Sequence, residues 1–515
     1  MTTEAAPLAA LPAQDLLLPD DDHNRALVAD VHPPDWTNPE PAGRYNLVVV
    51  GGGTAGLVSA FGAAGLGARV ALVERHLMGG DCLNHGCVPS KGLLRSAHAL
   101  HDVRGAGELG VDVRGEVGFD FGRAMERMRR LRAGIARHDS ARRLADSGID
   151  VFLGDATFVG RDEVEVAGTR LRFRRAVIAT GARAATIPVP GLAEAGCLTN
   201  ETVFSLTRLP KRLVVIGAGP IGCELAQAFQ RFGAEVTIVS LDPTVLPRED
   251  PDAAAVVGAA LQRDGIELRL GARLSRVETS RAGKVVAFDR GDGEESVVGD
   301  EILLAVGRAP NTDGLGLEAA GVAFDRTGVQ VDDRLRTTNP RVFAAGDICS
   351  VYKFTHAADA MARIVLQNAL FGGRKKASAL SIPWCTFTDP EVAHVGLYEH
   401  QAREQGLDVQ SYAVQLSEVD RAVLDGETEG FARLHVEGRT GRILGATLVA
   451  RRAGDMLGEA VLAITEGLGA DALSRAIAPY PTQGEVWKRL GDAHQRTRLT
   501  PTVAGWFARW FRWRR

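Results

Sequence analysis

Two cysteines separated by four residues form the most reactive feature of the sequence. Cys82 and Cys87 follow two glycines and precede a Pro-Ser-Lys run that ends at Lys91. From Ser90 to about His101, apolar residues recur at helical spacing, so the pair is expected near a helix N-terminus. The dipole and free N–H groups there favour an anion, and a thiol ionises more easily. Two thiols this close can form a disulfide, and a disulfide beside an electron donor is a redox catalyst.

Two other interpretations of the pair are a structural disulfide and half of a zinc site. A zinc site needs further cysteine or histidine ligands at short spacing. The other cysteines are scattered singly along the chain: Cys197, Cys223, Cys349 and Cys385. A stapling disulfide is typical of small secreted domains, whereas this chain has 515 residues and no signal-peptide pattern. The spacing therefore favours a redox pair, and we predict no resident metal.

The run Gly-Gly-x-Cys-x4-Cys-Val-Pro-Ser-Lys at residues 79–91 resembles the pyridine nucleotide-disulfide oxidoreductases. The resemblance covers about residues 44–493 and is strongest, in several places, to the mercuric reductase branch. It implies an α/β fold with two Rossmann-like dinucleotide-binding domains, for FAD and NAD(P), and a C-terminal α+β dimerisation domain. The predicted parts are an acidic Pro-rich arm (1–43), an FAD-binding domain (44–190 and 312–382), an NAD(P)-binding domain (191–311), a dimerisation domain (383–493) and a basic aromatic tail (494–515).

The first dinucleotide site is predicted from a glycine-rich turn after a buried strand. Residues 45–50 are mainly apolar and lead into a G-x-G-x-x-G motif formed by Gly51, Gly53 and Gly56. The next strand ends at Glu74, at the distance expected for an acid that binds a ribose hydroxyl. Glycines let the backbone approach a pyrophosphate while the following helix N-terminus supplies N–H donors. The resemblance assigns this site to FAD.

A second strand–glycine–helix unit begins at about residue 211 and carries Gly217, Gly219 and Gly222. By resemblance, this unit binds the nicotinamide cofactor. Its second strand ends at Ser240, where a carboxylate would favour NADH and repel a 2′-phosphate. The absence of that acid favours NADPH over NADH, although Asp242 lies nearby and no arginine follows at once.

The resemblance also implies which residues surround the flavin and carry the electrons. Cys87 is expected against the flavin as the charge-transfer thiolate, while Cys82 faces the acceptor as the interchange thiol. Lys91 and Glu224 match a pair that sits beside the flavin in the family. The other expected cofactor contacts are Gly80, Thr180, Gly181, Gly307 and Asp347, the last through the ribityl chain.

One position near the C-terminus departs from the family pattern. Disulfide reductases carry a His-Pro-Thr-x-x-Glu run whose histidine, from the partner subunit, moves protons for the thiols. Here Tyr480 replaces the histidine, and Glu485 has no imidazole to orient. A phenol with an ordinary pKa of about 10 is a poor proton shuttle at neutral pH. This argues against efficient disulfide exchange unless His356 or His85 substitutes.

We therefore expect a homodimeric flavoprotein that passes electrons from NAD(P)H through FAD to Cys82 and Cys87. The acceptor is a disulfide, a metal or another thiol-reactive compound. The C-terminal cysteine pair of mercuric reductases is missing, because the last cysteine is Cys385. The alternatives are a flavin reductase of quinones, dioxygen or metals in which the dithiol is secondary, and a redox-sensing flavoprotein on a membrane surface.

Composition limits these functions without choosing among them. The net charge is −4, 45% of residues are hydrophobic and 24% are charged, which is typical of a globular enzyme and gives no sign of nucleic-acid binding. Six cysteines in this length suit a reducing compartment, so a cytoplasmic location is expected. A basic run at residues 122–147 predicts one long helix with an apolar stripe.

The two ends of the chain differ from the rest. Residues 1–43 contain seven prolines and eight acids, and the part from about residue 22 is expected to lie as an arm on the folded body. Residues 494–515 contain six arginines and no acid, interleaved with aromatic residues. Such a tail suits the inner face of a membrane, or a membrane-bound partner, slightly better than packing on the dimer or on another partner, and nucleic-acid binding has no other support.

Overall fold

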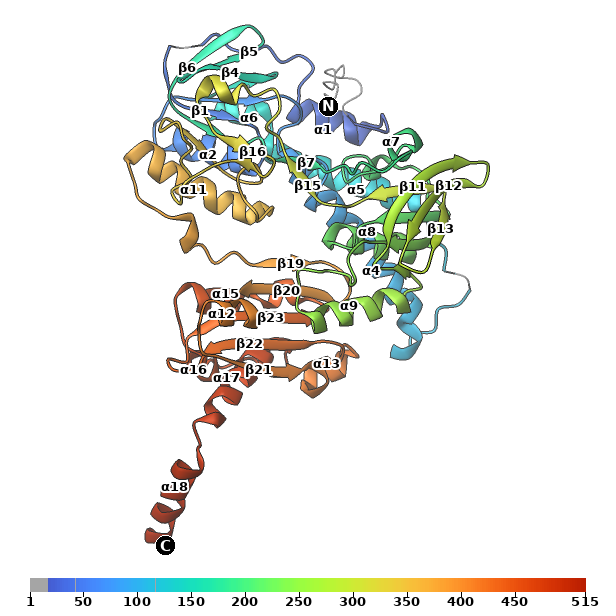
Figure 1. The fold of residues 1–515 in the computed structure, drawn as a ribbon, viewed down its shortest axis with the longest axis vertical. Helices are drawn as coiled ribbons and strands as arrows, with labels where there is room; N and C mark the ends of the chain where they lie inside the picture. The colour runs from blue at the N-terminus through green and yellow to red at the C-terminus, as the bar shows by residue number, and fades with distance from the viewer. Residues whose placement is uncertain (1–16, 42, 116) are drawn as a thin grey trace. The chain divides into compact units, whose positions relative to one another are not determined.

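The computed structural model describes residues 17–41, 43–115 and 117–515. The chain divides into two compact units: unit 1 is Met1–Gly217, Ala228–Val236 and Leu274–Ala379, and unit 2 is Ala218–Gln227, Thr237–Arg273 and Leu380–Arg515. Figure 1 shows the elements of each unit. Residues 1–16 of the predicted N-terminal arm lie outside the described residues.

Unit 1 is built on a mainly parallel sheet with the strand order β3-β2-β1-β6, to which β18 adds beside β6 (Figure 1). The strands are β1 (Tyr45–Val50), β2 (Val70–Glu74), β3 (Ile149–Leu153), β4 (Ala156–Gly160), β5 (Glu163–Val166), β6 (Thr169–Ile178) and β18 (Val342–Ala344). β1 pairs in parallel with β2 and with β6, so Leu47 lies between Val70 and Arg175. β4 and β5 continue from β6 as antiparallel strands.

Helices cover this sheet because its strands are apolar on both faces. The helices of unit 1 are α1 (Asp22–Val31), α2 (Thr54–Gly65), α3 (Gly80–Asn84), α4 (Cys87–Gly105), α5 (Phe121–Ala136), α6 (Ala141–Asp146), α7 (Leu192–Ala195), α10 (Leu317–Ala320) and α11 (Thr355–Phe371), of which α2, α6, α10 and α11 contact the sheet. Helices α2 and α11 pack so closely that a Cβ on Gly62 would lie 2.4 Å from a methyl carbon of Leu366.

Unit 1 also contains three smaller strand pairs: β7 (Ala182–Ala184) with β15 (Arg308–Pro310), β8 (Arg212–Ile216) with β14 (Glu301–Leu304), and β16 (Phe324–Asp325) with β17 (Gly328–Val329). A separate three-stranded sheet is formed by β11 (Arg273–Ser280), β12 (Gly283–Asp289) and β13 (Glu294–Gly299). The β8–β14 pair is parallel and leads through Gly217 into α8 (Pro220–Phe232). This is the second strand–glycine–helix unit that the sequence predicts.

Unit 2 contains a five-stranded antiparallel sheet with the order β19-β20-β23-β22-β21 (Figure 1). The strands are β19 (Trp384–Thr386), β20 (Glu391–Gly396), β21 (Val409–Gln415), β22 (Phe431–Glu437) and β23 (Ile443–Ala450). Its helices are α9 (Pro251–Arg263), α12 (Glu399–Glu404), α13 (Asp420–Asp425), α14 (Ala453–Met456), α15 (Gly458–Thr465), α16 (Ala470–Arg475), α17 (Val486–Thr497) and α18 (Pro501–Trp513), and a parallel pair joins β9 (Glu235–Val239) to β10 (Glu267–Arg269). The fully buried Trp487 anchors α17 in the core of this unit.

The predicted α/β fold class is confirmed, but one predicted element is wrong. Residues 122–147 do not form one helix, because α5 ends at Ala136 and α6 begins at Ala141. Ser140 caps the second helix, since its hydroxyl accepts a hydrogen bond from the Arg143 N–H. A serine with extended backbone offers the chain this alternative to a continuous helix.

Candidate active site

The two cysteines lie where two helices begin. Cys82 lies in α3, and Cys87 is the first residue of α4. The Cys87 Sγ lies 3.7 Å from the hydroxyl oxygen of Thr355, which is the first residue of α11. The positive ends of both helices therefore favour a negative charge on the exposed Cys87 sulfur. The sequence predicted the helix start at the cysteines but gave no signal for Thr355, which is 268 residues away.

The surroundings of Cys82 favour its protonated form. A hydrogen bond to Cys87 is the main cause that raises the pKa of Cys82, and burial raises it further. Asp81 adds a smaller effect of the same sign, because a neighbouring carboxylate disfavours a second anion. Cys82 therefore holds its proton more firmly than a free thiol does.

The first glycine-rich turn is shaped for close approach of a ligand's phosphates. Gly51 has a φ of +109°, and a Cβ there would lie 2.3 Å from the carbonyl oxygen of Ala179. A Cβ on Gly56 would lie 1.8 Å from the Gly51 carbonyl oxygen. Side chains are therefore excluded where α2 begins, as a pyrophosphate cradle requires. These residues fit FAD, which the sequence places here.

Two further predicted contacts border this turn. A Cβ on Gly80, whose φ is +61°, would lie 2.6 Å from the Gly53 Cα, so the cysteine loop and the glycine turn touch. The Glu74 carboxylate accepts N–H bonds from Gly52 at 2.6 Å and His76 at 2.7 Å. Burial raises the pKa of Glu74 despite these donors. The structure thus brings Gly51, Gly53, Gly56, Gly80 and Glu74 together.

Asp347 and the cysteine loop are linked by an arginine that the sequence reasoning did not assign to the site. The Arg308 Nη1 lies 3.0 Å from Asp81, and its Nε lies 3.6 Å from Asp347. Burial raises the pKa of both carboxyl groups, and Arg308 opposes this rise. Its position in a Val-Gly-Arg run after a strand was the available signal. Asn200 also donates to Asp81, at 3.1 Å.

The two chain segments around Thr180 and Asn311 are joined by hydrogen bonds. The Thr180 hydroxyl donates to the carbonyl of Asn311 at 2.9 Å, and the Asn311 side chain donates back to the Thr180 carbonyl at 2.9 Å. Gly181 and Gly307 both have positive φ, and β7 pairs with β15 between them. Thr180, Gly181 and Gly307 therefore lie on one two-stranded crossing.

The second glycine-rich turn repeats the geometry of the first. Gly217 has a φ of +109°, and a Cβ there would lie 2.5 Å from the carbonyl oxygen of Ala305. Gly219 precedes α8, and Gly222 lies in its first turn. Ser240 is buried, and its hydroxyl accepts the N–H of Asp242 at 3.3 Å.

Lys91 and Glu224 belong to different units, and their predicted pairing stays a prediction. Lys91 is half-buried and is the fifth residue of α4. Glu224 is buried in α8 and accepts a hydrogen bond from the Phe387 N–H at 2.9 Å. Phe387 opens the predicted dimerisation domain, so this bond fixes α8 to that segment within unit 2.

The position that the family fills with histidine is occupied by an exposed phenol. The Tyr480 hydroxyl donates to the Asp420 carboxylate at 2.8 Å, and this bond raises the pKa of Tyr480. Glu485 accepts from Arg489 Nε at 2.9 Å. The phenol thus holds its proton more firmly than usual, which strengthens the argument against proton transfer at neutral pH.

The two histidines considered as substitutes differ in their surroundings. Burial lowers the pKa of His85 to about 4, and its ring stacks on His76 at a centroid distance of 6.3 Å. His85 therefore stays neutral at pH 7. His356 is exposed beside Thr355 and stacks on Phe354 at 5.5 Å.

The N-terminal arm reaches the cysteine loop through a buried arginine. Helix α1 packs on α5, with Leu27 and Val31 buried. The guanidinium of Arg132 donates to the Asn24 side chain and to the Asn84 carbonyl, both at 2.7 Å. Asn84 ends α3, so the arm contacts the helix that carries Cys82 through one side chain.

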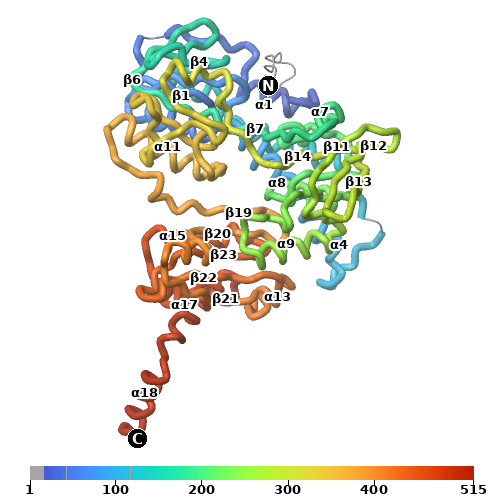
Figure 2. The backbone as a smooth tube through the Cα atoms, in the orientation of Figure 1, coloured from blue at the N-terminus to red at the C-terminus, as the bar shows by residue number. Residues whose placement is uncertain are grey.

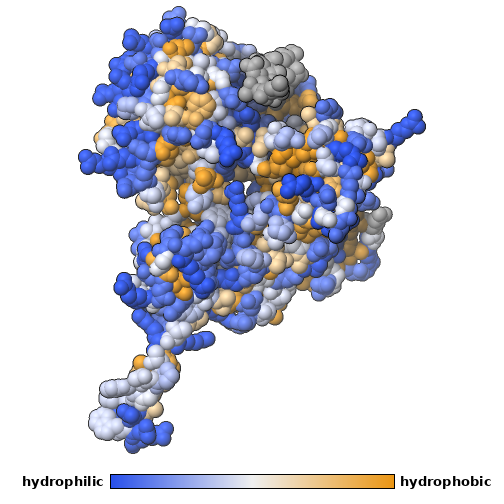
Figure 3. Space-filling model, in the orientation of Figure 1, coloured by the Kyte–Doolittle hydropathy of each residue, from blue (hydrophilic) through white to orange (hydrophobic). Residues whose placement is uncertain are grey.

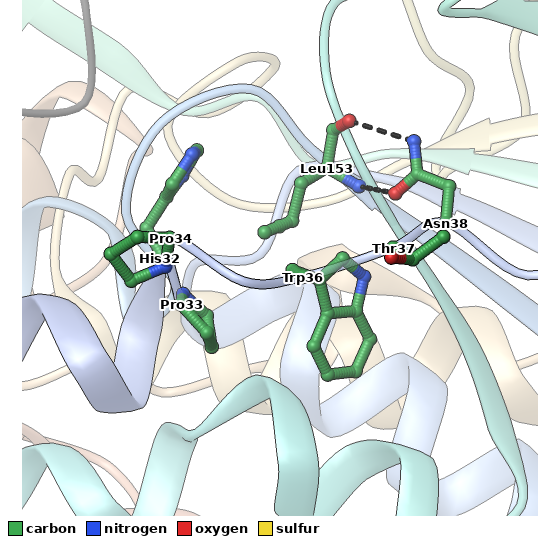
Figure 4. A pocket seen from close by; sticks show the side chains of 7 residues that line it. All are labelled: His32, Pro33, Pro34, Trp36, Thr37, Asn38 and Leu153. Atoms are coloured by element: carbon green, nitrogen blue, oxygen red, sulfur yellow. Dashed lines mark hydrogen bonds between the residues drawn. The ribbon is translucent and has the colours of Figure 1, made fainter.

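The arm then covers the edge of β3. The Asn38 side chain donates to the Leu153 carbonyl at 3.0 Å and accepts its N–H at 2.8 Å (Figure 4). Trp36 Nε1 donates to the carbonyl of Val151. Between the arm and this strand lies an open pocket of about 380 Å³.

Among the described residues, no three His, Cys, Asp or Glu side chains are grouped to hold a metal ion.

Comparison with known proteins agrees with this geometry. Residues 45–362 match the family model described as pyridine nucleotide-disulphide oxidoreductase, and residues 382–490 match the dimerisation domain of that family. Mercuric reductase of Lysinibacillus sphaericus is 37% identical over 443 residues, covering 86% of this chain and 81% of the relative. Dihydrolipoyl dehydrogenase of Thermus scotoductus is 34% identical over 462 residues, covering 87% and 97%.

A solved structure is similar over the same region. The HOCl-induced flavoprotein disulfide reductase RclA from Escherichia coli is 30% identical, with a TM-score of 0.77, covering 87% of this chain and 99% of that chain; it has also been solved as a Cu(II) complex. The family uses FAD and NAD(P)H. The chain is therefore an NAD(P)H-dependent flavoprotein enzyme that belongs to the pyridine nucleotide-disulphide oxidoreductase family.

Proposed function

We propose that this enzyme passes electrons from NADPH through FAD to Cys82 and Cys87 and on to a thiol-binding metal ion such as Cu(II). The observation that carries this proposal is Tyr480, which bonds Asp420 where a disulfide reductase needs a proton-transferring histidine. A metal ion needs thiolates but no proton for a departing thiol. The Cu(II) complex of RclA and the similarity to mercuric reductase support the same class of acceptor.

The roles of the site residues and the predicted domain boundaries are part of this proposal. FAD, when bound, supplies two-electron exchange between a reduced nicotinamide and the cysteine pair. Gly51, Gly53, Gly56 and Gly80 leave room for its phosphates, Glu74 and Asp347 bind its hydroxyl groups, and Thr180, Gly181 and Gly307 lie on the crossing beside it. Lys91, paired with Glu224, stabilises negative charge near Cys87.

The cysteine chemistry balances with Cu(II) as oxidant. Two electrons and one proton convert the Cys82–Cys87 disulfide to a thiol on Cys82 and a thiolate on Cys87. Two Cu(II) ions then take one electron each, the sulfur–sulfur bond forms again, and the Cys82 proton is released. The raised pKa of Cys82 and the helix N-termini at Cys87 set which sulfur carries the proton.

The residue at the end of β9, in the second glycine-rich unit, bears on the choice between NADPH and NADH. Ser240 ends β9 with a hydroxyl, and a 2′-phosphate meets no carboxylate at that residue. We infer a preference for NADPH over NADH. Ser240→Glu should reverse it, because a carboxylate repels the 2′-phosphate and accepts a ribose hydroxyl. The ratio of kcat/KM for the two nucleotides measures this directly.

We further propose a homodimer in which the partner's C-terminal domain completes the acceptor site. Residues 382–490 match the dimerisation domain, and Tyr480 and Glu485 lie within it. The two residues would then border the cysteines of the other subunit, with Tyr480 as a positioning group for the acceptor.

Steady-state NADPH oxidation with three acceptors tests the proposal. Purified enzyme and Cys82→Ser are compared with Cu(II), with a small disulfide and with a quinone. We expect Cu(II) reduction that falls at least about 100-fold in Cys82→Ser, because the interchange sulfur is lost. Quinone reduction by both enzymes with no Cu(II) reduction by the wild type, or Cu(II) reduction that is unchanged in Cys82→Ser, would contradict the proposal. It would assign the enzyme to direct flavin chemistry.

A further inference from the structure

The last helix of the chain has no core to pack against. Helix α18 begins after Thr500, whose hydroxyl accepts the Val503 N–H at 3.3 Å, and Pro501 occupies its first turn. It therefore has its own start signals and ends at Trp513. Every side chain of α18 is exposed. Figure 2 follows the backbone of unit 2 from α17 into this helix.

The helix has one apolar face and one basic face. Successive residues of an α-helix are rotated by about 100°, so the apolar side chains occupy about half of the circumference. They are Val503, Trp506, Phe507, Trp510, Phe511 and Trp513, and their exposed fractions run from 38% to 76%. Arg509 and Arg512 lie on the opposite side. Figure 3 shows hydrophobic and strongly hydrophilic side chains together in this segment.

The surroundings of the helix argue against two ordinary uses of an apolar face. The match to the family's dimerisation domain ends at residue 490, so α18 lies outside the region matched to that domain. Thirteen residues span about 20 Å, which is shorter than the roughly 30 Å hydrocarbon core of a bilayer. Among the helices that the structure describes, none has the length and hydropathy to span a bilayer.

The positive charge of the C-terminal segment indicates the kind of surface that α18 would contact. Residues 494–515 contain six arginines and no acid in a chain whose net charge is −4. The guanidinium of Arg514 lies over the ring of Trp510, 4.9 Å from its centroid. Tryptophan rings prefer the headgroup depth of a bilayer, and arginines bind anionic headgroups from there. A folded helix of this kind lies in the plane of the interface.

We propose that α18 holds the enzyme on an anionic lipid surface, as at the cytoplasmic face of a membrane. The apolar face enters the headgroup boundary, and the long arginine side chains reach acidic headgroups at the membrane surface. Residues 491–500 join it to the five-stranded domain without any acid other than Asp492. This inference does not depend on the acceptor, because the helix carries none of the site residues.

Vesicle flotation of the full-length holoenzyme tests the proposal. Vesicles of phosphatidylcholine with phosphatidylglycerol are compared with vesicles of phosphatidylcholine alone. We expect flotation with the anionic vesicles only. Trp506→Ser with Trp510→Ser should lower partitioning at least about tenfold. Arg509→Gln with Arg512→Gln should lower it about 25-fold, at about fivefold per arginine.

A matched control removes two exposed apolar side chains elsewhere, Leu109→Ser with Val111→Ser, and should float as the wild type does. Because α18 is exposed, the helix variants should keep their FAD absorbance and melting temperature. Absence of flotation with anionic vesicles, or unchanged flotation of the tryptophan variant, would overturn the proposal. So would a change from dimer to monomer in that variant by light scattering, since the face would then join two copies.

Discussion

The Nη1 atom of Arg308 lies 3.0 Å from a carboxylate oxygen of Asp81, while the Nε atom lies 3.6 Å from Asp347. One guanidinium thus joins the loop of the redox cysteines to the strand end that is expected to hold the flavin ribityl chain. Arg308 is 11% exposed, so its charge has few other partners. Arg308 therefore fixes the position of the cysteine loop relative to Asp347.

Arg308→Met should loosen FAD and destabilise unit 1. Both carboxyl groups already have raised pKa values through burial, and removing the guanidinium leaves two acids close to each other. Breaking such a pair costs about 3–5 kcal/mol. We expect FAD affinity to fall at least about tenfold, measured by flavin fluorescence during reconstitution of the apoenzyme.

Arg142→Met is the control for this change. Arg142 lies on α6 and pairs with the exposed Asp35 at 2.8 Å, a surface ion pair worth about 0–1 kcal/mol. Its FAD affinity should stay within about twofold of the wild type. Equal FAD affinity in the Arg308 variant and the wild type would show that the guanidinium does not position the site.

The N-terminal arm should stabilise the cysteine loop through Arg132. This side chain is 1% exposed, and burial lowers its pKa to about 10, so it is charged at neutral pH. Asn24→Ala removes one of its acceptors and should cost about 1–3 kcal/mol in the free energy of unfolding. The charge-transfer absorbance of the reduced enzyme should also change, because the same guanidinium holds Asn84 at the end of α3. Arg25→Ala, which breaks only exposed ion pairs in α1, should leave both readouts unchanged.

Tyr480→His should restore disulfide chemistry. An imidazole at this position titrates near neutral pH and can be oriented by Glu485, so proton transfer to a departing thiol becomes possible. We expect kcat/KM for a small disulfide to rise at least about tenfold in NADPH-dependent assays. Tyr480→Phe loses the bond to Asp420 without gaining a titrating group and should show no such rise. If both variants gain equally, the phenol blocks the site sterically and its proton chemistry is irrelevant.

Glu391 should make the stability of unit 2 depend on pH. Burial raises the pKa of this β20 side chain from its ordinary value of 4.5 to about 7, although it accepts the Gly454 N–H at 2.9 Å. Because the folded state binds the proton more tightly, stability is highest below about pH 4.5 for this group and is lost as pH rises through 7. The loss is about 2–3 kcal/mol between pH 5 and pH 8.

Urea unfolding of Glu391→Gln checks this sign. The variant should lose less stability than the wild type between pH 5 and pH 8, since glutamine does not ionise. Glu404→Gln removes an exposed carboxylate of the same unit and should keep the wild-type slope. A slope of Glu391→Gln equal to that of the wild type would contradict the assignment.

The sequence predicted those parts of the site that rest on local patterns. The strand predicted at residues 45–50 has the same bounds as β1, and the cysteines lie at the helix start that the apolar spacing indicates. Glycine spacing predicted the turn at Gly51, because a Cβ at this residue would lie only 2.3 Å from the Ala179 carbonyl oxygen. These features depend on neighbours a few residues away, so a single sequence carries them.

Contacts between distant residues were not predictable in the same way. Nothing near Thr355 indicates that it lies against Cys87, and nothing in the arm indicates that Asn24 meets Arg132. The break at Ser140 was missed because a basic, amphipathic stretch suits one helix as well as two. The partner of Tyr480 depends on how α13 packs, which local spacing does not encode.

Anaerobic titration of the purified enzyme with NADPH, followed by visible absorbance, tests the proposed electron path most directly. Thiolate on Cys87 beside the flavin should produce a long-wavelength charge-transfer band after about two electrons, before the flavin bleaches, and Cys87→Ser should abolish it. Cys82→Ser should show the band without any NADPH, since its Cys87 cannot form the disulfide. Immediate bleaching of the wild-type flavin without this band would show that the cysteines are outside the electron path.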